Sequence, residues 1–389
     1  MARKKVDSIL FTYVKIYIEE DSFMKIICSQ QELLNGVNIV SKAVSDNTTM
    51  ALLKCILIQA GNGEIRLTAN DMDLGIETVI SGQIEIAGMA AIDAKDFLAV
   101  IRKLDNSDIT IETDDNFNMT ITCNKRKINL LGKSGDEFTF LPKVEKKDNV
   151  QISMFAIKDI IRQTIFSIGN SDINKVMSGV HMVIKNDQLR VTTLDGHRIS
   201  IRKVQLKSIY EEQEVIIPGK ALNELSKILP ADADKEISIY FSDAHVSFEF
   251  DKTIVVSRLI DGQYINVDKM MSSDYKTKVK VNKAEIIKSV DLSMLFSKEG
   301  NKKPLVVDIR DDVMELKCNA PLGSLDDFIE IQKQGDDILI GFNPKFVMDA
   351  LRAIDEDEID MYFINPRSPL YIKDENEKYV YMILPINLS

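Results

Sequence analysis

The sequence predicts an α+β fold that occurs three times along one chain, and two observations carry that prediction. A ten-residue stretch recurs at residues 95–104, 220–229 and 345–354, and its first lysine returns at equal intervals. Self-similarity at a fixed period is the signature of a repeated structural unit. Short segments whose apolar residues alternate with a period of two flank each copy, as expected of half-buried strands. Each repeat is therefore predicted to pack two helices on antiparallel sheets.

With 389 residues the chain has room for three domains of ordinary size. The repeat begins near residue 24, so we expect an N-terminal extension over residues 1–23 that takes no part in the cores. The three domains are predicted at residues 24–147, 148–274 and 275–389.

The elements follow the same order in each domain: a strand and a helix, further strands, the recurring helix, and more strands. In the first domain Ser29 is the predicted N-cap of a helix that runs to about residue 44. The strands expected there cover residues 25–28, 56–59, 65–69, 74–80, 109–112, 119–123 and 127–131. In the second domain a strand and helix at 150–167 precede strands at 180–184, 189–193, 237–240, 246–250 and 254–259. In the third domain a strand and helix at 278–296 precede strands at 305–309, 313–318, 359–363, 370–373 and 379–384.

The recurring stretch is predicted to form an amphipathic helix. Apolar residues at positions i, i+3, i+4 and i+7 share one helix face at roughly 100° per residue. The opposite face carries two basic residues in each copy, namely Lys95 with Arg102, Lys220 with Lys227, and Lys345 with Arg352. In a single helix such a face is usually a solvated surface and nothing more, but three copies in register favour a shared role.

The charge of the chain restricts where a nucleic acid could bind. The net charge is −11, and phosphate binding needs clustered Lys and Arg that release counterions. We therefore expect any contact with DNA to be confined to the face made by the basic helices.

Composition is that of a globular protein from a reducing compartment. Hydrophobic residues make up 45% and charged residues 28% of the chain. Cys28, Cys55, Cys123 and Cys318 form no CxxC pair, which favours reduced thiols over a disulfide framework or a zinc site. No apolar run approaches the ~18 residues of a membrane span. We expect a cytoplasmic protein that does not enter a membrane.

No stretch of the sequence predicts a catalytic site, a metal site or a cofactor. Asp71 and Asp73 alternate on a predicted strand and could hold Mg²⁺ for phosphoryl transfer, although exposed strand carboxylates are far commoner. His181, His197 and His245 are the only histidines, and no nucleophile motif accompanies them. The chain is therefore predicted not to be an enzyme.

One stretch of the second domain departs from its counterparts in the other two repeats. Leu194-Asp195-Gly196-His197-Arg198 follows a predicted strand, where the first repeat has Asn-Asp-Met-Asp at 70–73 and the third has Asn-Ala-Pro-Leu at 319–322. Such a departure favours a function private to that domain. The alternative is a plain turn with glycine in the left-handed region.

Together with Ile340-Gly341-Phe342-Asn343 and Leu384-Pro385-Ile386, this stretch makes residues 24–389 resemble the bacterial sliding clamps, the beta subunits of the DNA polymerase III holoenzyme. The resemblance implies a non-catalytic processivity factor that tethers the polymerase to its template. It implies a head-to-tail homodimer whose six similar domains form a closed ring, with the helices lining the hole around duplex DNA. Binding would then be independent of sequence, because contacts to phosphates alone carry no base information.

The resemblance also implies two sets of contact residues. The dimer contact would join Ile128 and Leu130 of the first domain to Leu295 and Phe296 of the third. Asn47 stands where the family can have an arginine that contacts DNA, so DNA contact is expected to depend more on the basic helices.

A pocket between the second and third domains is the last feature that the resemblance implies. It would accept a short extended peptide from the polymerase alpha subunit, the clamp loader and other proteins with a clamp-binding motif. Matched motif to motif, its lining comprises Met177, Leu194, Gly196, His197, Arg198, Ile199, Ile265, Met270, Met382, Leu384, Pro385 and Ile386. Some of these could instead be plain core residues. Departures from the family pattern at Leu194, Ile265 and Asn387 are expected to change peptide preference without abolishing the pocket.

The residues leave two other functions open. A metal-dependent nuclease or polymerase component would use Asp71 and Asp73, and it would lose Mg²⁺-dependent turnover when both become asparagine. A repeat scaffold that binds only proteins would be indifferent to charge reversal at Lys95, Lys220 and Lys345, whereas a ring around DNA would not.

Overall fold

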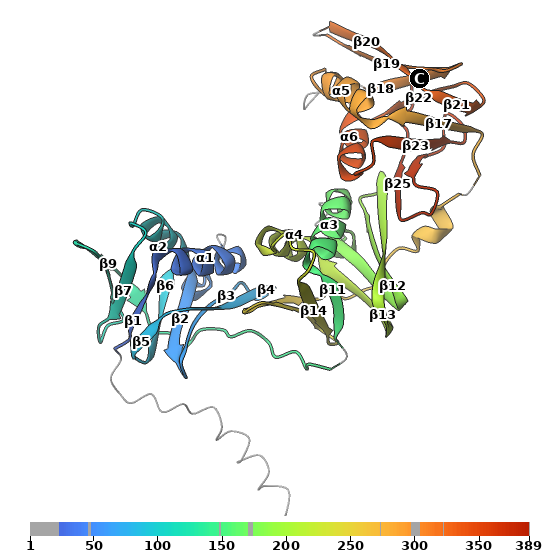
Figure 1. Ribbon diagram of the computed structural model, residues 1–389. Coiled ribbons are helices and arrows are strands. Elements are labelled where there is room, and N and C mark those ends of the chain that lie inside the picture. The colour runs from blue at the N-terminus through green and yellow to red at the C-terminus, as the bar shows by residue number, and fades with distance from the viewer. Residues whose placement is uncertain are drawn as a thin grey trace, which may run out of the picture. The chain divides into compact units, whose positions relative to one another are not determined.

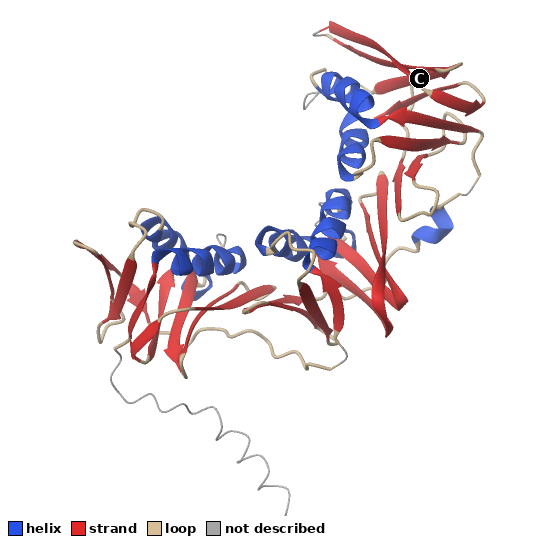
Figure 2. Ribbon diagram, viewed as in Figure 1, coloured by secondary structure: helices blue, strands red, loops and turns tan. Residues whose placement is uncertain are grey.

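The computed structural model describes residues 23–45, 48–147, 149–169, 174–272, 274–296, 304–321 and 323–388, which divide into two units (Figure 1). Unit 1 comprises the residues up to Lys146 together with Ser238–Arg258, and unit 2 comprises Lys147–Ile237 together with the residues from Leu259 onward. Within each unit the α-helices lie on one side of the strands (Figure 2). The architecture is α+β, as predicted. Apart from Phe23, the predicted N-terminal extension lies outside the described residues.

The helices begin where a side chain can satisfy their free N–H groups. The capping residues are Ser29 for α1, Asp93 for α2, Ser153 for α3, Asn282 for α5 and Asn343 for α6, while α4 follows Pro218. The α-helices are α1 (Gln30–Val40) and α2 (Ala94–Ile101) in unit 1, and α3 (Met154–Thr164), α4 (Gly219–Ile228), α5 (Lys283–Met294) and α6 (Pro344–Ala353) in unit 2. Short 3₁₀ helices are η1 (Ser41–Ala43), η2 (Ala51–Lys54), η3 (Ile165–Ser167), η4 (Lys175–Ser178) and η5 (Val267–Met270).

The recurring stretch of the sequence forms α2, α4 and α6, which confirms the prediction of three amphipathic helices. Their apolar stripes are buried, as shown by Phe97 in α2, Leu222 in α4 and Leu351 in α6, each at most 1% exposed. Burial of one face fixes the opposite, basic face towards solvent.

Unit 1 contains two antiparallel sheets. One has the strand order β5-β1-β7-β8-β9, and the other runs β10-β6-β2-β3-β4-β16-β15-β14. Pairing of β4 with β16 attaches Ser238–Arg258 to this unit, and it brings the hydroxyls of Thr78 and Thr253 to 2.8 Å. The strands are β1 (Lys25–Ser29), β2 (Cys55–Gly61), β3 (Glu64–Asn70), β4 (Leu74–Ile80), β5 (Gln83–Ile86), β6 (Gly88–Asp93), β7 (Asp108–Thr113), β8 (Met119–Cys123), β9 (Arg126–Leu130), β10 (Gly132–Lys133), β14 (Glu236–Phe241), β15 (His245–Phe250) and β16 (Thr253–Arg258).

Unit 2 also contains two sheets, with the strand orders β12-β13-β25-β24-β23-β17-β21 and β20-β19-β18-β22. Antiparallel pairing of Arg198–Arg202 in β13 with Tyr379–Ile383 in β25 makes the first sheet continuous. The strands are β11 (Val150–Ser153), β12 (Gly179–Leu194), β13 (Arg198–Pro218), β17 (Thr277–Asn282), β18 (Leu305–Arg310), β19 (Val313–Ala320), β20 (Gly323–Glu330), β21 (Gln332–Gly335), β22 (Ile338–Phe342), β23 (Glu358–Phe363), β24 (Leu370–Lys373) and β25 (Tyr379–Ile383).

The prediction of separate strands at 180–184 and 189–193 is wrong, because β12 is one strand of 16 residues. The polar residues between the two predicted strands are absorbed without ending the pairing. Asn186 has a φ of 56°, and the register with β13 shifts on both sides of it, as at a β-bulge.

Several strands were not predicted at all: β5, β6, β10, β13, β20, β21 and β22. In β5, β20 and β21 most side chains are exposed, so these strands lack the alternation of buried and exposed residues that reveals a strand in a sequence. No helix among the described residues is long and apolar enough to cross a membrane.

Candidate functional site

The basic side chains predicted on the recurring helices are all exposed. They are Lys95 and Arg102 at α2, Lys220 and Lys227 on α4, and Lys345 and Arg352 on α6. Several already meet neighbours, as where the Lys227 ammonium lies 2.6 Å from the Glu224 carboxylate and the Arg102 guanidinium donates to the Asn38 amide oxygen at 3.0 Å. Exposed pairs of this kind contribute little free energy, so a phosphate can displace them. Asn47, the remaining residue predicted to face DNA, lies outside the described residues.

Asp195, Gly196 and His197 form the turn between β12 and β13, as the sequence predicts. Gly196 has a φ of 86°, a conformation that favours glycine. The Asp195 carboxylate accepts hydrogen bonds from the backbone N–H groups of His197 and Arg198 at 3.0 and 3.1 Å. The N–H of Leu384 donates to the carbonyl of His197 at 2.8 Å, which ties the C-terminal segment to this turn.

One face of the paired strands β13 and β25 carries an apolar group of side chains, named here the outer cluster. Its buried members are Leu194, Ile199, Ile201, Ile216, Tyr264, Val267, Tyr362, Tyr371, Val380 and Met382, and Val176, Met177, Ile260, Ile265, Met271 and Ile364 pack against them. Five residues predicted for the peptide pocket therefore come together here: Met177, Leu194, Ile199, Ile265 and Met382.

Four other predicted pocket residues lie at the surface next to the outer cluster or beyond it. Met270 is 52% exposed and Leu384 is 37% exposed, whereas Pro385 and Ile386 are half-buried. The N–H of Ile386 donates to the carbonyl of Gly341 at 2.7 Å. The C-terminal segment is thus held on both sides by backbone hydrogen bonds while Leu384 stays accessible.

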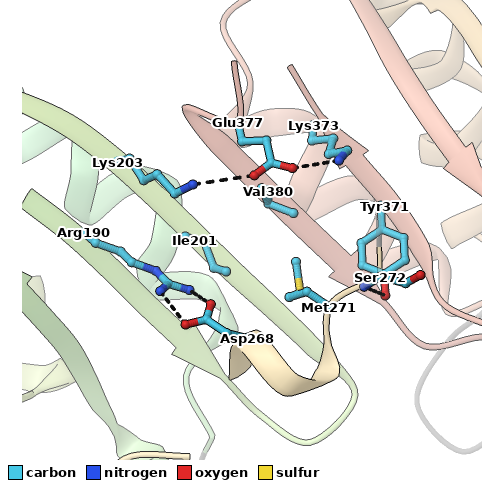
Figure 3. Close-up of a pocket in the computed structure, with 10 residues that line it drawn as sticks. All are labelled: Arg190, Ile201, Lys203, Asp268, Met271, Ser272, Tyr371, Lys373, Glu377 and Val380. Atoms are coloured by element: carbon cyan, nitrogen blue, oxygen red, sulfur yellow. Dashed lines mark hydrogen bonds and ion pairs between the residues drawn. The ribbon is translucent and has the colours of Figure 1, made fainter. Parts of the chain in front are cut away.

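A cavity of about 280 Å³ opens beside the outer cluster (Figure 3). Ile201, Met271, Tyr371 and Val380 belong both to its lining and to the outer cluster. The remaining lining residues are polar or charged: Arg190, Lys203, Asp268, Ser272, Lys373 and Glu377. This cavity could not be predicted from the sequence, because its lining comes from β12, β13, β24, β25, the connection between β24 and β25, and the segment after β16, which are distant in the chain.

Arg198 lies on the other face of β13 from the outer cluster. Successive strand residues point to opposite faces, and the neighbouring Ile199 belongs to the outer cluster. The Arg198 side chain is 8% exposed, and its guanidinium lies 2.9 Å from the Asp195 carboxylate and 2.7 Å from that of Asp349. It also stacks 4.4 Å from the ring centre of Phe346. Arg198 therefore holds the turn in place from the face opposite the outer cluster. The exposed His197 ring lies on that same face, with its centre 5.9 Å from the centre of the Phe346 ring.

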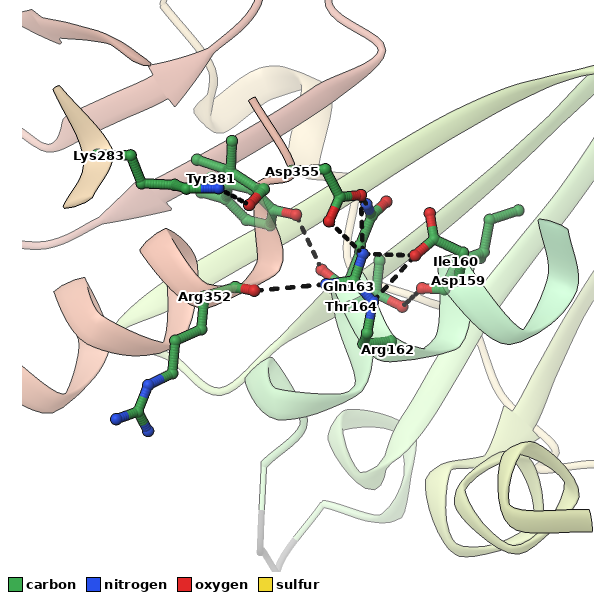
Figure 4. A network of polar contacts seen from close by, with 10 residues as sticks. Asp159, Ile160, Arg162, Gln163, Thr164, Lys283, Arg352, Asp355 and Tyr381 are labelled. Carbon is green, nitrogen blue, oxygen red and sulfur yellow. Dashed lines mark hydrogen bonds and ion pairs between the residues drawn. The ribbon is translucent and has the colours of Figure 1, made fainter. Parts of the chain in front are cut away.

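A second polar network joins α3 to the segment that follows α6 (Figure 4). The Arg162 guanidinium lies 2.8 Å from the Asp355 carboxylate, to which the Gln163 amide also donates at 3.0 Å. The buried Tyr381 hydroxyl donates to the Gln163 carbonyl at 3.1 Å. These contacts join residues that are about half the chain length apart in sequence. They hold α3 against the segment that follows α6 and against β25.

In unit 1, β9 is an edge strand within the part of the chain that the structure describes. Ile128 and Leu130, predicted for a dimer contact, are half-buried on the face that β8 turns to the core. Lys127 lies on the opposite face, and Leu131, the next residue after β9, is 84% exposed.

In unit 2, β20 is likewise an edge strand among the described residues. Leu295, predicted for the dimer contact, is 54% exposed after α5, and Phe296 is half-buried beside Gly323. The prediction missed Phe328, which is 65% exposed on β20 between Asp326 and Glu330 on the same face. A strand prediction for residues 323–330 would have revealed this face.

Asp71 supports a turn between β3 and β4. Its carboxylate accepts hydrogen bonds from the backbone N–H groups of Asp73 and Leu74 at 3.1 and 2.7 Å. Within the described residues, no group of three or more His, Cys, Asp or Glu side chains could hold a metal ion. The geometry thus gives Asp71 a structural role.

The four cysteines lie within the described residues, where they are buried and form no disulfide. Burial raises the pKa of the Cys28 thiol to about 12, so the thiol stays protonated and unreactive at neutral pH.

Family models match the chain along nearly its whole length. The N-terminal, central and C-terminal domains of the DNA polymerase III beta subunit match residues 24–142, 151–266 and 269–387. The beta sliding clamp of Staphylococcus epidermidis is 31% identical over 374 residues, which cover 93% of this chain and 99% of that protein.

Solved structures give the same result. A putative DNA polymerase III beta subunit from Eubacterium rectale aligns with a TM-score of 0.91 and 53% identity, over 94% of this chain and 99% of that one. The DNA polymerase sliding clamp of Bacillus subtilis aligns with a TM-score of 0.91 and 30% identity, over 95% of this chain and all of that one. The agreement extends through both units of the fold.

Proposed function

We propose that two copies of this chain join head to tail into a ring around duplex DNA. The chain belongs to the family of DNA polymerase III beta subunits, the bacterial sliding clamps. As a member of that family the chain is a DNA sliding clamp, a non-catalytic processivity subunit of the polymerase. The alternative of a metal-dependent nuclease has no support in the family. The predicted domain boundaries at 24–147, 148–274 and 275–389 and the cytoplasmic location form part of the proposal.

The observation that carries the DNA contact is the common build of α2, α4 and α6. Each buries an apolar stripe and exposes two cations, in a chain whose net charge is −11. Exposed cations on a helix bind phosphates through counterion release and do not read bases, which suits a protein that slides. A closed ring stays on DNA because it encircles the duplex, so these few contacts with phosphates are enough and tight binding is not needed.

Ring closure is supported by the two edge strands. An exposed edge invites pairing with another chain, and β9 and β20 are such edges. On the core side, Ile128 and Leu130 of one copy would meet Leu295 and Phe296 of the next. On the outer side, Leu131 and Lys127 offer an apolar and a cationic group, which match Phe328 and its acidic neighbours on β20.

Peptide binding is assigned to the outer cluster and the accessible Leu384. Met177, Ile265 and Met382 supply flexible apolar side chains, which adapt to several partners. The partners are the polymerase alpha subunit, the clamp loader and other proteins with a clamp-binding motif. Arg198 acts as a positioning residue, because its buried ion pairs fix the turn that borders the outer cluster.

The decisive experiment loads the protein with a clamp loader onto a nicked circular duplex and then linearises the circle. Retention on the circle and release from the linear product are expected of a ring. A triple variant, Lys95→Glu, Lys220→Glu and Lys345→Glu, should load or slide poorly. Charge reversal at the exposed Lys185, Lys252 and Lys378 is the matched control. Equal retention on circle and line, or no difference between the two triple variants, would contradict encirclement through the basic helices.

A further inference from the structure

The cavity beside the outer cluster has an excess of positive charge. Among its described lining residues, Arg190, Lys203 and Lys373 face only two carboxylates, those of Asp268 and Glu377. This sign is opposite to that of the whole chain, whose net charge is −11. A local cationic site in an acidic protein selects anionic groups.

Both carboxylates remain ionised at neutral pH. The hydrogen bond from Arg190 lowers the pKa of Asp268, and the hydrogen bond from Lys373 lowers the pKa of Glu377. Neither group can therefore give the cavity a larger positive charge by taking up a proton near pH 7. The excess is one cation, which matches one incoming carboxylate.

The cations are incompletely satisfied by these two acids. Glu377 is shared, at 2.8 Å from Lys373 and at the longer distance of 3.6 Å from Lys203. The Arg190 guanidinium uses its two terminal nitrogens on Asp268, and its Nε is buried with no hydrogen-bond partner. Donors in this condition gain from an added acceptor.

Size and position indicate what kind of acceptor fits. Pockets that hold whole small-molecule ligands usually measure about 300–1,000 Å³, and this cavity is about 280 Å³. The volume is at the lower end of that range, so the cavity has room for a side chain of a bound peptide. Ile201, Met271 and Val380 line both the cavity and the outer cluster, so a peptide lying on the outer cluster passes the cavity.

We propose that this cavity receives an aspartate or glutamate side chain from the segment next to the apolar residues of a bound partner peptide. The inference rests on the proposed peptide binding at the outer cluster. The apolar residues of the peptide give affinity there. The acidic residue, which accepts hydrogen bonds from Lys203 and Lys373, discriminates between partners that possess it and partners that do not.

The test measures the binding of labelled ten-residue peptides by fluorescence anisotropy. Each peptide has one half rich in leucine and phenylalanine and one half with either two glutamates or two glutamines. Each pair is made with the polar half before and after the apolar half, because the direction of the bound chain is open. The native protein should bind one glutamate peptide roughly fivefold more tightly than its glutamine twin, an advantage that shrinks with added salt.

Three variants separate this site from a general charge effect. Lys373→Met should remove most of the advantage of the glutamate peptide and leave the glutamine peptide unchanged. Glu377→Gln should increase the advantage, because it removes the acid that competes for both lysines. Lys185→Met, on an exposed part of β12 outside the cavity, is the matched control and should change neither affinity. Thermal melts check that the variants fold.

The outcomes distinguish the inference from the function on which it rests. If the glutamate and glutamine peptides bind equally well, or if Glu377→Gln does not favour the glutamate peptide, the acidic site is wrong while the peptide pocket stands. If no peptide binds to the native protein, the pocket at the outer cluster is itself contradicted, and the inference is overturned with it.

Discussion

The junction where β13 pairs with β25 differs from the free edges of β9 and β20: at the junction the sheet continues, and at the edges it ends. At the junction, residues 198–202 pair with 379–383, which makes the sheet β12-β13-β25-β24-β23-β17-β21 continuous. At β9 and β20 the described chain offers no further strand, and large apolar side chains are exposed, with Leu131 at 84% and Phe328 at 65%. Apolar side chains that are exposed at a sheet edge are suited to contact with another chain, which is why we propose these two edges as the surfaces that join two copies.

The electrostatics of the two regions differ in the same way. At the junction the charged groups are paired within the chain, as in the contacts of Arg198 with Asp195 and Asp349. At the free edges like charges gather on each strand, with Lys127 on β9 and Asp326 and Glu330 on β20. A region that satisfies its own charges stabilises the fold, whereas a region that segregates them is suited to a partner.

The largest effect is expected from Phe328→Glu. This change removes an apolar anchor and adds a third acid beside Asp326 and Glu330, so the dimer should weaken at least about 100-fold. Light scattering during size-exclusion chromatography at micromolar concentration measures the mass. Phe155→Glu, at a phenylalanine that is 50% exposed on α3, is the control and should leave a dimer. A dimeric Phe328→Glu variant would place the interface elsewhere.

Breaking the junction should instead cost stability without changing the oligomer. Arg198→Met removes one partner of a buried ion pair and leaves two carboxylates uncompensated. We expect the free energy of unfolding of unit 2 to fall by about 3 kcal/mol, measured by urea denaturation. The apparent mass should remain that of the native protein. A loss of less than about 1 kcal/mol would show that Asp195 and Asp349 are satisfied without Arg198.

Charge reversal at the free edges should change the affinity of the dimer. Lys127→Glu and Asp326→Lys each place like charges across the proposed interface, and each should weaken the dimer by roughly fivefold. The double variant restores opposite signs and should recover most of the native affinity. Analytical ultracentrifugation gives the dissociation constants. If the losses of dimer affinity from the two single variants simply add in the double variant, Lys127 of one copy does not lie near Asp326 of the other.

The smallest effect is expected in the polar network that joins α3 to the segment after α6. Asp355→Asn removes the ion pair with Arg162, but the Asp355 side chain is 66% exposed. Solvent screens such a pair, so the free energy of unfolding should fall by about 0.5 kcal/mol, far less than for Arg198→Met. A loss as large as that of Arg198→Met would show that the network in Figure 4 acts as one cooperative unit.

The candidate site was only partly predictable. Met177, Leu194, Ile199, Ile265 and Met382 do come together, as the resemblance to the family implied. The position of Arg198 behind the turn could not be predicted, because it depends on which face of β13 the third part of the chain covers. Phe328 was missed because β20 is largely exposed and carries little pattern. The cavity residues Lys373 and Glu377 were missed because the cavity brings together segments that are distant in the chain.

The repeat, the helices and most of the strands of this protein follow from local patterns in the sequence. Amphipathic periods and capping residues act over a few positions, so they can be found without knowledge of the rest of the chain. Three features are visible only in the tertiary structure: β12 is unbroken, β13 pairs with β25, and a cationic cavity lies beside the outer cluster. These features join residues that are up to 190 positions apart, as Arg190 and Val380 of the cavity are, and such pairings depend on the packing of the whole unit and not on local preference.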